Sequence, residues 1–383
     1  MQKKFVISGS ETLIKTVIDY DKELNEEQLA VVKNGEGPCL VLAGAGSGKT
    51  RTIVYRVAYL IEHGVDPQNI LLLTFTNKAA KEMMERTERL LGTSLRGLWG
   101  GTFHSVSHRI LRSAASRMGF RNNFSILDQD DTRDLIKATL KDLSIDVKAR
   151  RFPSPAVVQS IISYGRNARM ALSEVIERKH PRFLPMKSEL ETIARLFAEK
   201  KREANAMDFD DLLIVLLDLL NQNAEIREHL QNQFKYILVD EYQDTNPIQA
   251  ELVRVLAGQH QNILVVGDDA QSIYSFRAAD IKNILRFPDI FPGAKTFRLE
   301  TNYRSTPEIL SLANDIISKN QAQFSKTLRP VCESFEKPQL IAAQSQMEQA
   351  KFIAEMIQTL RDEGVKLEEM AVLFRATHHS QAL

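Results

Sequence analysis

CLVLAGAGSGKT, residues 39–50, is the stretch that decides the fold. An apolar run, Cys39–Leu42, leads into the glycine-rich segment Ala43–Gly48, which is followed by Lys49 and Thr50. A continuous apolar run is typical of a strand that is buried on both faces of a sheet. Glycines after such a strand let successive backbone N–H groups surround a phosphate at the positive end of the next helix. The stretch therefore predicts a strand, a phosphate loop and a helix.

Further apolar runs have the same character, and each is followed by a polar or glycine-rich loop. They are Ile70–Leu73, Tyr236–Val239 and Ile263–Val266. Buried strands that alternate with helices indicate a parallel α/β sheet covered on both faces. Ligands of such sheets bind at the carboxyl ends of the strands, so we expect the functional residues directly after each run.

Helical patterns replace the strand signal between Leu90 and about Ala206. The α/β pattern resumes near Met207, and a further α/β pattern begins after about Asp280. The expected helices are 106–116, 130–143 and 188–205, and the later expected strands are 338–342 and 370–374. A helical insertion is thus predicted to interrupt an α/β domain. The last expected strand lies nine residues before Leu383, so we expect the chain to be a piece of a longer one.

Composition limits the classes of protein to which the chain can belong. A length of 383 residues suggests two or three domains. There are 50 Lys and Arg residues against 49 Asp and Glu, a net charge of +1, so a nucleic-acid surface must be a local patch. Two cysteines indicate a reducing cytoplasm, and the apolar window Leu212–Leu220 is too short to span a membrane.

The predicted phosphate loop and a pair of carboxylates indicate triphosphate hydrolysis. Lys49 would reach the β- and γ-phosphates, and the Thr50 hydroxyl would bind Mg²⁺. Asp240 and Glu241 follow the apolar run Tyr236–Val239. A carboxylate at this position holds the magnesium ion, and Glu241 is placed to deprotonate the attacking water. An Asp-Glu pair alone is more often a solvated turn, but the phosphate loop upstream favours catalysis.

Other polar residues could complete the nucleotide site. Gln271 could contact the γ-phosphate, although a polar surface loop is an alternative. Tyr303 offers a ring to a base, and Arg304 offers a guanidinium to phosphate. Gln28 could contact a base edge, or it could simply form a capping box with Asn25 at a helix start.

Taken together, the motifs resemble those of the UvrD/Rep/PcrA-like superfamily 1A DNA helicases over nearly the whole chain. The matching stretches are 24–28, 43–50, 74–80, 101–105, 240–244, 267–277 and 301–305, in the order and spacing of the family. The resemblance implies RecA-like P-loop NTPase domains that use ATP and Mg²⁺. It also implies movement along single-stranded DNA in the 3′-to-5′ direction, single-strand/duplex junctions as substrates, and partners in repair or replication.

The resemblance also assigns roles to residues. Lys49, Asp240, Glu241, Gln271 and Arg304 would act in catalysis, and Thr50 and Asp240 would hold Mg²⁺. Arg304 belongs to the later domain, so closing the cleft would bring it to the site. The residues expected to bind the nucleotide are Gln28, Ala43, Gly44, Ala45, Gly46, Ser47, Gly48, Lys49, Thr50, Arg51, Tyr303 and Arg304.

For DNA, the family stacks aromatic side chains on the bases of a single strand. The positions that match its DNA-contacting motifs are Phe75, Thr76, Asn77, Thr102, Phe103, His104, Tyr274 and Phe276. Ordinary core packing is the alternative for the aromatic residues. Residues 93–127 add five arginines without one acidic residue, which favours a polyanion. A solvated helix face is the alternative there.

The resemblance implies a division into domains. Residues 1–91 and 206–280 would form the first RecA-like domain, 92–205 its DNA-binding helical insertion, and 281–383 part of a second RecA-like domain. Phe276 replaces a common Trp of the family, and the last two family motifs would lie beyond Leu383. The rival functions are a DNA-stimulated ATPase that displaces proteins without unwinding, and a fragment that binds ATP and single-stranded DNA without turnover.

Overall fold

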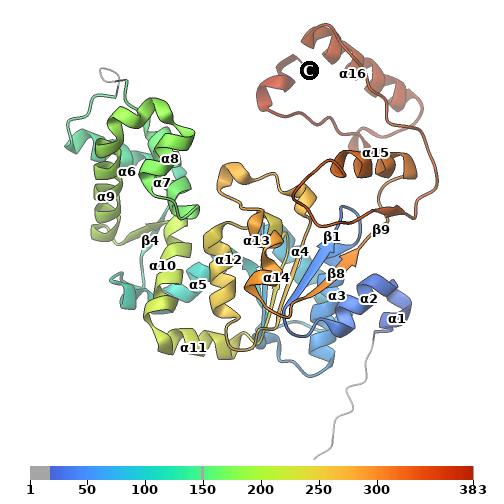
Figure 1. The fold of residues 1–383 in the computed structure, drawn as a ribbon, viewed down its shortest axis with the longest axis horizontal. Helices are drawn as coiled ribbons and strands as arrows, with labels where there is room; N and C mark the ends of the chain where they lie inside the picture. The colour runs from blue at the N-terminus through green and yellow to red at the C-terminus, as the bar shows by residue number, and fades with distance from the viewer. Residues whose placement is uncertain (1–17, 148–150, 383) are drawn as a thin grey trace, which may run out of the picture. The chain divides into compact units, whose positions relative to one another are not determined.

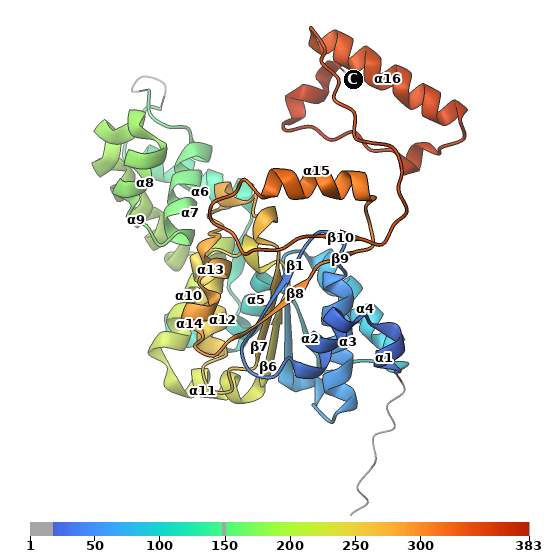
Figure 2. The same cartoon turned by 45° about the vertical axis from the view of Figure 1, so that its right-hand side comes forward.

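The computed structural model describes residues 18–147 and 151–382 (Figures 1 and 2). They divide into two compact units, one ending at Glu333 and the other beginning at Ser334. Among these residues, no helix combines the length and the apolar character that crossing a lipid bilayer requires.

A six-stranded parallel sheet forms the centre of the first unit, in the order β3-β2-β6-β7-β1-β8. Its strands are β1 (Cys39–Ala43), β2 (Ile70–Thr74), β3 (Trp99–Thr102), β6 (Tyr236–Val239), β7 (Ile263–Gly267) and β8 (Lys295–Leu299). The four strands predicted from apolar runs are therefore confirmed, and so is the parallel α/β fold.

Alternate side chains of the strands enter two separate cores, because successive residues of a strand face opposite sides of a sheet. In β1, Leu40 and Leu42 belong to one core, and Cys39 and Val41 belong to the other. Figure 2 shows the helices that cover each face. One face carries α2 (Glu26–Asn34), α3 (Lys49–Glu62) and α4 (Asn77–Leu91), and the other carries α5 (Phe103–Ala114), α10 (Phe209–Gln222), α11 (Ala224–Gln233), α12 (Pro247–Leu256), α13 (Lys282–Leu285) and α14 (Phe287–Ile290).

A group of helices with its own apolar core follows α5. It consists of α6 (Gln129–Asp142), α7 (Pro155–Asn167), α8 (Leu172–Lys179) and α9 (Lys187–Glu203). A short parallel pair, β4 (Ser125–Leu127) with β5 (Ala206–Asp208), joins the segments that enter and leave this group. The helical insertion is thus present, but the expected absence of strands from about residue 90 to 206 is wrong, since β3 and β4 lie there.

Polar side chains set the starts of several helices. Asn25, Asp128, Asp208 and Asn246 each form a capping box at the start of α2, α6, α10 and α12. Such boxes satisfy backbone N–H groups that the first helical turn leaves without partners. The capping box predicted for Asn25 and Gln28 is therefore present at the start of α2.

The chain after Asp280 differs from the prediction in two respects. Strand β8 pairs with β1, so the first sheet extends past the expected boundary at residue 280. The expected strands 338–342 and 370–374 are wrong, because the second unit contains no sheet in its described residues. Leu340 is 97% exposed and Leu373 93%, which shows that these apolar runs have no neighbouring strand or core there.

The remaining elements are short or lie near the end of the chain. The first unit adds α1 (Tyr20–Glu23), β9 (Thr301–Asn302), α15 (Pro307–Ile317), β10 (Arg329–Pro330) and the 3-10 turns 67–69, 115–118, 181–186, 242–244, 269–271 and 275–277. The second unit contains α16 (Gln346–Asp362) and the 3-10 turns 367–369 and 377–382.

Candidate nucleotide and DNA sites

The phosphate loop connects the end of β1 to the start of α3, as the sequence predicts. Gly46 and Gly48 have φ angles of 73° and 85°, in the left-handed region that favours glycine. A Cβ atom on Gly46 would lie 2.6 Å from the Cβ of Arg304, and one on Gly48 would lie 2.5 Å from Nε2 of Gln28. The loop therefore needs glycine for its backbone and for the close approach of these two side chains.

Lys49 and Glu241 meet beneath this loop. The Lys49 ammonium lies 2.9 Å from Oε2 of Glu241, and Gln243 donates an Nε2 hydrogen bond of 2.9 Å to the same oxygen. Glu241 has a φ of 51°, a costly conformation for a residue other than glycine, and such strain clusters at functional sites. The two side chains predicted to act on phosphate and water are thus in direct contact.

Asp240 is the buried carboxylate of the site. It is 6% exposed, and its Oδ1 has no hydrogen-bond partner. Burial, with Glu241 adding to it, raises the pKa of Asp240 to about 7. Lys49 opposes this shift only in part, and a further cation placed beside the carboxyl group would keep it ionised.

The arrangement is compatible with Mg²⁺, which commonly takes one or two carboxylates together with phosphate and water oxygens. Within residues 18–147 and 151–382, no cluster of three or more His, Cys, Asp or Glu side chains could hold a metal by itself. Thr50, Asp240, Glu241 and Gln271 line one cavity of about 540 Å³. This cavity brings together the two residues expected to bind Mg²⁺ with Glu241 and Gln271, whereas Lys49 and Arg304 are not in its described lining.

Residues from both ends of the first unit dock on the phosphate loop. Gln28 donates an Nε2 hydrogen bond of 3.1 Å to the Ser47 carbonyl. Asn302 donates one of 2.6 Å to the Ala45 carbonyl, and the Tyr303 N–H donates one of 2.9 Å to the Gly46 carbonyl. The backbone and Cβ of Arg304 therefore lie against the loop already, whereas the sequence led us to expect that a closing movement brings this residue to the site.

Asn302 and Asn25 have contacts at the nucleotide site that the sequence did not predict, and Arg51, which was expected to bind the nucleotide, has an acidic partner instead. Asn302 also accepts hydrogen bonds from the backbone N–H groups of Arg304 and Ser305, so its side chain shapes the turn that presents them. Asn25, expected only as a cap, donates a 2.7 Å hydrogen bond to the Tyr303 hydroxyl. Arg51 binds Glu23 at 2.8 Å, which directs its guanidinium away from the loop.

A buried polar network holds the side chain of Gln271. Its Nε2 donates a 2.6 Å hydrogen bond to Asp268, whose backbone N–H donates one of 3.0 Å to Oε1 of Gln243. Since Gln243 also binds Glu241, the network connects two of the side chains expected to act in catalysis. Beyond its place in the stretch 240–244, nothing in the sequence marks Gln243 as a functional residue.

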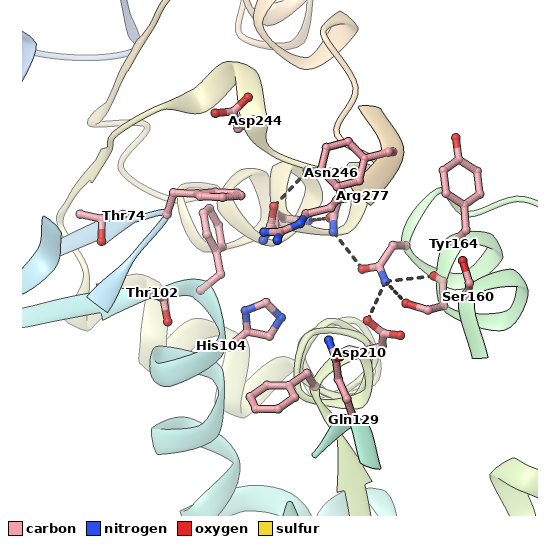
Figure 3. A pocket seen from close by; sticks show the side chains of 17 residues that line it. Thr74, Thr102, His104, Gln129, Ser160, Tyr164, Asp210, Asp244, Asn246 and Arg277 are labelled. Carbon is pink, nitrogen blue, oxygen red and sulfur yellow. Dashed lines mark hydrogen bonds between the residues drawn. The ribbon is translucent and has the colours of Figure 1, made fainter. Parts of the chain in front are cut away.

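A second cavity, of about 510 Å³, lies between the end of the sheet and the helical insertion (Figure 3). Five of the residues predicted to contact DNA line it, namely Phe75, Thr102, Phe103, His104 and Phe276. Thr74, Phe75 and Thr102 come from the ends of β2 and β3. Both cavities contain Phe75 and Asp244, so the two candidate sites adjoin.

The aromatic residues expected to contact DNA differ in how far their side chains are exposed. Phe75 is half-buried, its ring centre 5.3 Å from that of Tyr274, which is 5.8 Å from that of Phe276. Phe276 is 66% exposed, so these three rings form an open aromatic row. Phe103 is buried in a core, as the packing alternative predicts.

The polar residues among them sit at helix starts. Thr76 and Thr102 cap α4 and α5 through their hydroxyl groups. Asn77 is exposed at the first position of α4. Burial lowers the pKa of His104, with a smaller opposing effect of Asp210.

Figure 3 also shows a polar chain that sequence reasoning missed. Asn167 donates a 2.7 Å hydrogen bond to Asp210 and accepts one of 2.9 Å from Asn246. Phe209 lines the same cavity, is exposed, and packs edge-on against His104. Asn167 and Asn246 are separated by 79 positions, and only the tertiary fold brings them together.

Two of the five arginines in residues 93–127 contact other parts of the chain. Arg112 donates hydrogen bonds to the carbonyls of Asn122 and Phe124, and Arg109 stacks at 3.6 Å over Trp99. The described lining of the cavity in Figure 3 includes none of the five arginines. Their assignment to DNA stays a prediction.

A parallel sheet whose first strand leads through a phosphate loop into a helix is typical of a P-loop NTPase domain. Residues 24–292 match the UvrD/REP helicase N-terminal domain, and residues 297–383 match the UvrD-like helicase C-terminal domain. The chain belongs to the UvrD/REP helicase family, which confirms the resemblance found in the motifs.

Curated relatives include proteins named ATP-dependent DNA helicase PcrA. The protein from Staphylococcus epidermidis is 42% identical over 363 residues, which cover 94% of this chain and 49% of that protein. The protein from Staphylococcus aureus is 41% identical over 364 residues, with the same coverage. The chain thus spans about half the length of the curated relatives that it matches.

Proposed function

We propose that the chain is the part of an ATP-dependent DNA helicase or translocase that binds ATP and single-stranded DNA. The observation that carries this proposal is the adjacency of the two cavities, one lined by Thr50, Asp240, Glu241 and Gln271, the other by aromatic side chains. The shared residue Phe75 gives a short physical path between them. The name of the PcrA relatives and the family of the chain support the same reading.

In the proposed mechanism, the backbone N–H groups of the phosphate loop and Lys49 bind the ATP phosphates. Lys49 exchanges its Glu241 partner for phosphate oxygens, which leaves the Glu241 carboxylate free to accept a proton from the attacking water. Asp240 and Thr50 would hold Mg²⁺, which supplies charge neutralisation at the phosphates. Gln271 and Arg304 contact the terminal phosphate, and the Tyr303 ring and the Gln28 amide face the base.

In the proposed DNA path, Phe75, Tyr274 and Phe276 stack on successive bases, which suits binding without sequence preference. The 3′-to-5′ direction, the preference for single-strand/duplex junctions and partners from repair or replication follow from the family resemblance, and the cytoplasmic location follows from the two cysteines. The division into a first RecA-like domain (1–91 and 206–280), a DNA-binding insertion (92–205) and part of a second RecA-like domain (281–383) is proposed on the same ground. Strands β3 and β8 and helix α5 are added to the first domain, because they belong to its sheet and core.

The proposal has two rivals. A DNA-stimulated ATPase that displaces proteins would hydrolyse ATP without separating strands. A binding fragment would hold ATP and single-stranded DNA without turnover. Hydrolysis and strand-displacement assays on this chain and on a longer form separate the three.

The first experiment measures ATP binding and hydrolysis by this chain with and without single-stranded DNA. Lys49→Ala should abolish hydrolysis and leave DNA affinity nearly unchanged, because Lys49 contacts the nucleotide phosphates in the proposal. Lys81→Ala is the matched control, since Lys81 is an exposed side chain on α4. Failure of the unaltered chain to bind ATP would refute the proposal, and binding without turnover would favour the binding fragment.

A further inference from the structure

The segment that follows α15 returns to the nucleotide site and touches it at two places. The Phe324 N–H donates a 2.8 Å hydrogen bond to Asp269, which follows the end of β7. The Leu328 side chain packs so closely on Gly44 that a Cβ atom there would lie 2.3 Å from its Cδ2. The segment therefore spans from the phosphate loop to the loop that carries Gln271.

Lys326 is the buried charge of this segment. Its side chain is 5% exposed, and its ammonium donates to Oδ1 of both Asp268 and Asp269, which are themselves buried. Two adjacent carboxylates in a buried place repel one another unless a cation lies between them. Lys326 thus places a cation in contact with both carboxylates and fixes their positions relative to one another.

Asp268 transmits this contact to Gln271. One oxygen of Asp268 accepts from Lys326 and from the Ala270 N–H, and the other accepts the 2.6 Å hydrogen bond from the Gln271 amide. The carboxylate can hold the amide in one orientation only while its own orientation is fixed. Loss of the Lys326 ammonium would free Asp268 to turn away from Asp269, and Gln271 would lose its fixed partner.

We propose that Lys326 is a positioning residue that holds Gln271, through Asp268, in the orientation in which it contacts the terminal phosphate of ATP. The inference rests on the proposed function, because Gln271 acts on phosphate only if ATP binds there. It adds that discrimination between ATP and ADP depends on the segment after α15, 55 positions away from Gln271.

The test measures the affinities of this chain for ATP and ADP, each with Mg²⁺, by titration calorimetry. Lys326→Met should lower the affinity for ATP about tenfold, the loss of one hydrogen bond to a charged group, and leave the affinity for ADP within about twofold. Lys326→Arg should restore part of the difference, because it retains the charge. Lys319→Met alters an exposed lysine in the turn directly after α15, in the same segment as Lys326, and should change neither affinity.

A second variant separates positioning from folding. Gln271→Ala should reproduce the selective loss of ATP affinity, and combining it with Lys326→Met should add nothing further, since both changes remove the same contact. Equal losses for ATP and ADP, or additive losses in the double variant, would overturn the inference. If Lys326→Met does not fold, the combination of Gln271→Ala with Lys326→Arg decides by the same criterion.

Titration of the unaltered chain separates failure of the role of Lys326 from failure of nucleotide binding. Equal affinity for ATP and ADP in that chain would overturn the role of Lys326 and Gln271 while leaving nucleotide binding intact. No binding of either nucleotide would refute the proposed function, and this inference would fall with it.

Discussion

Lys201 offers a sharp test of how the helical insertion is fixed to the sheet domain. Its side chain is 3% exposed at the end of α9 and binds Asp208 and, at 2.5 Å, Asp211. Arg166 of α7 binds Asp211 from the other side, also at 2.5 Å. Burial raises the pKa of Asp208; for Asp211 burial acts in the same direction, but Arg166 and Lys201 outweigh it and lower the pKa to about 2.

Removing one member of a buried ion pair costs about 3–5 kcal/mol, because the remaining charge stays buried without its partner. Replacing Lys201 by Met leaves Asp208 and Asp211 with Arg166 alone, so we expect a loss near the lower end, about 3 kcal/mol. The neighbouring Lys200 pairs with the exposed Asp142. Because exposed pairs contribute about 0–1 kcal/mol, Lys200→Met is the matched control on the same helix.

Urea unfolding of the two variants, followed by far-UV circular dichroism, gives the two free energies of unfolding. Asp208→Asn in the Lys201→Met background should recover part of the loss, since it removes one of the two carboxylates left without Lys201. Equal small losses for Lys200→Met and Lys201→Met would refute the reasoning, because they would mean that water reaches the cluster and screens it.

Two further predictions concern the aromatic cavity. Phe75→Ala should weaken single-strand binding by about 1–3 kcal/mol in a fluorescence titration without lowering the melting temperature. Phe103→Ala should instead lower the free energy of unfolding by about 3–5 kcal/mol, because its ring is buried in the core. A lowered melting temperature for Phe75→Ala would favour core packing over base stacking at that position. Burial lowers the pKa of His104 below the usual 6.5, so below pH 6.5 the unfolded chain takes up a proton that the folded chain resists. The free energy of unfolding should therefore fall as the pH drops through this range, and His104→Asn should flatten that dependence; an unchanged slope in the variant would contradict the assignment.

The parts of the site that depend on local sequence could be predicted. The phosphate loop, its glycines and the carboxylates after β6 lie within a few residues of the strand that positions them, so apolar runs and turn chemistry suffice to find them. Gln243, Asn167 and Lys326 could not be found in this way. Their partners lie in other elements, and a polar residue in a single sequence carries no mark of being buried.

The failure to predict the two edge strands of the sheet has one physical cause. In the six-stranded sheet, the four strands found from the sequence are the central ones, β2, β6, β7 and β1, whereas the two that were missed, β3 and β8, are its edges. A central strand is buried on both faces and between neighbours, which demands a continuous apolar run. The edge strand β3 contains two glycines, and β8 is largely exposed, so neither needs such a run.

The missed strand β8 explains why residues far apart in the chain meet at the phosphate loop. β1 and β8 are parallel neighbours, and their register pairs Ala43 with Leu299. Parallel strands that end side by side send their following segments out at the same edge of the sheet. The loop that begins at Gly44 and the turn at Asn302 are therefore brought together by this pairing, and their hydrogen bonds follow from it. A boundary at residue 280 hides this relation, because it assigns to separate domains two segments that leave one sheet together.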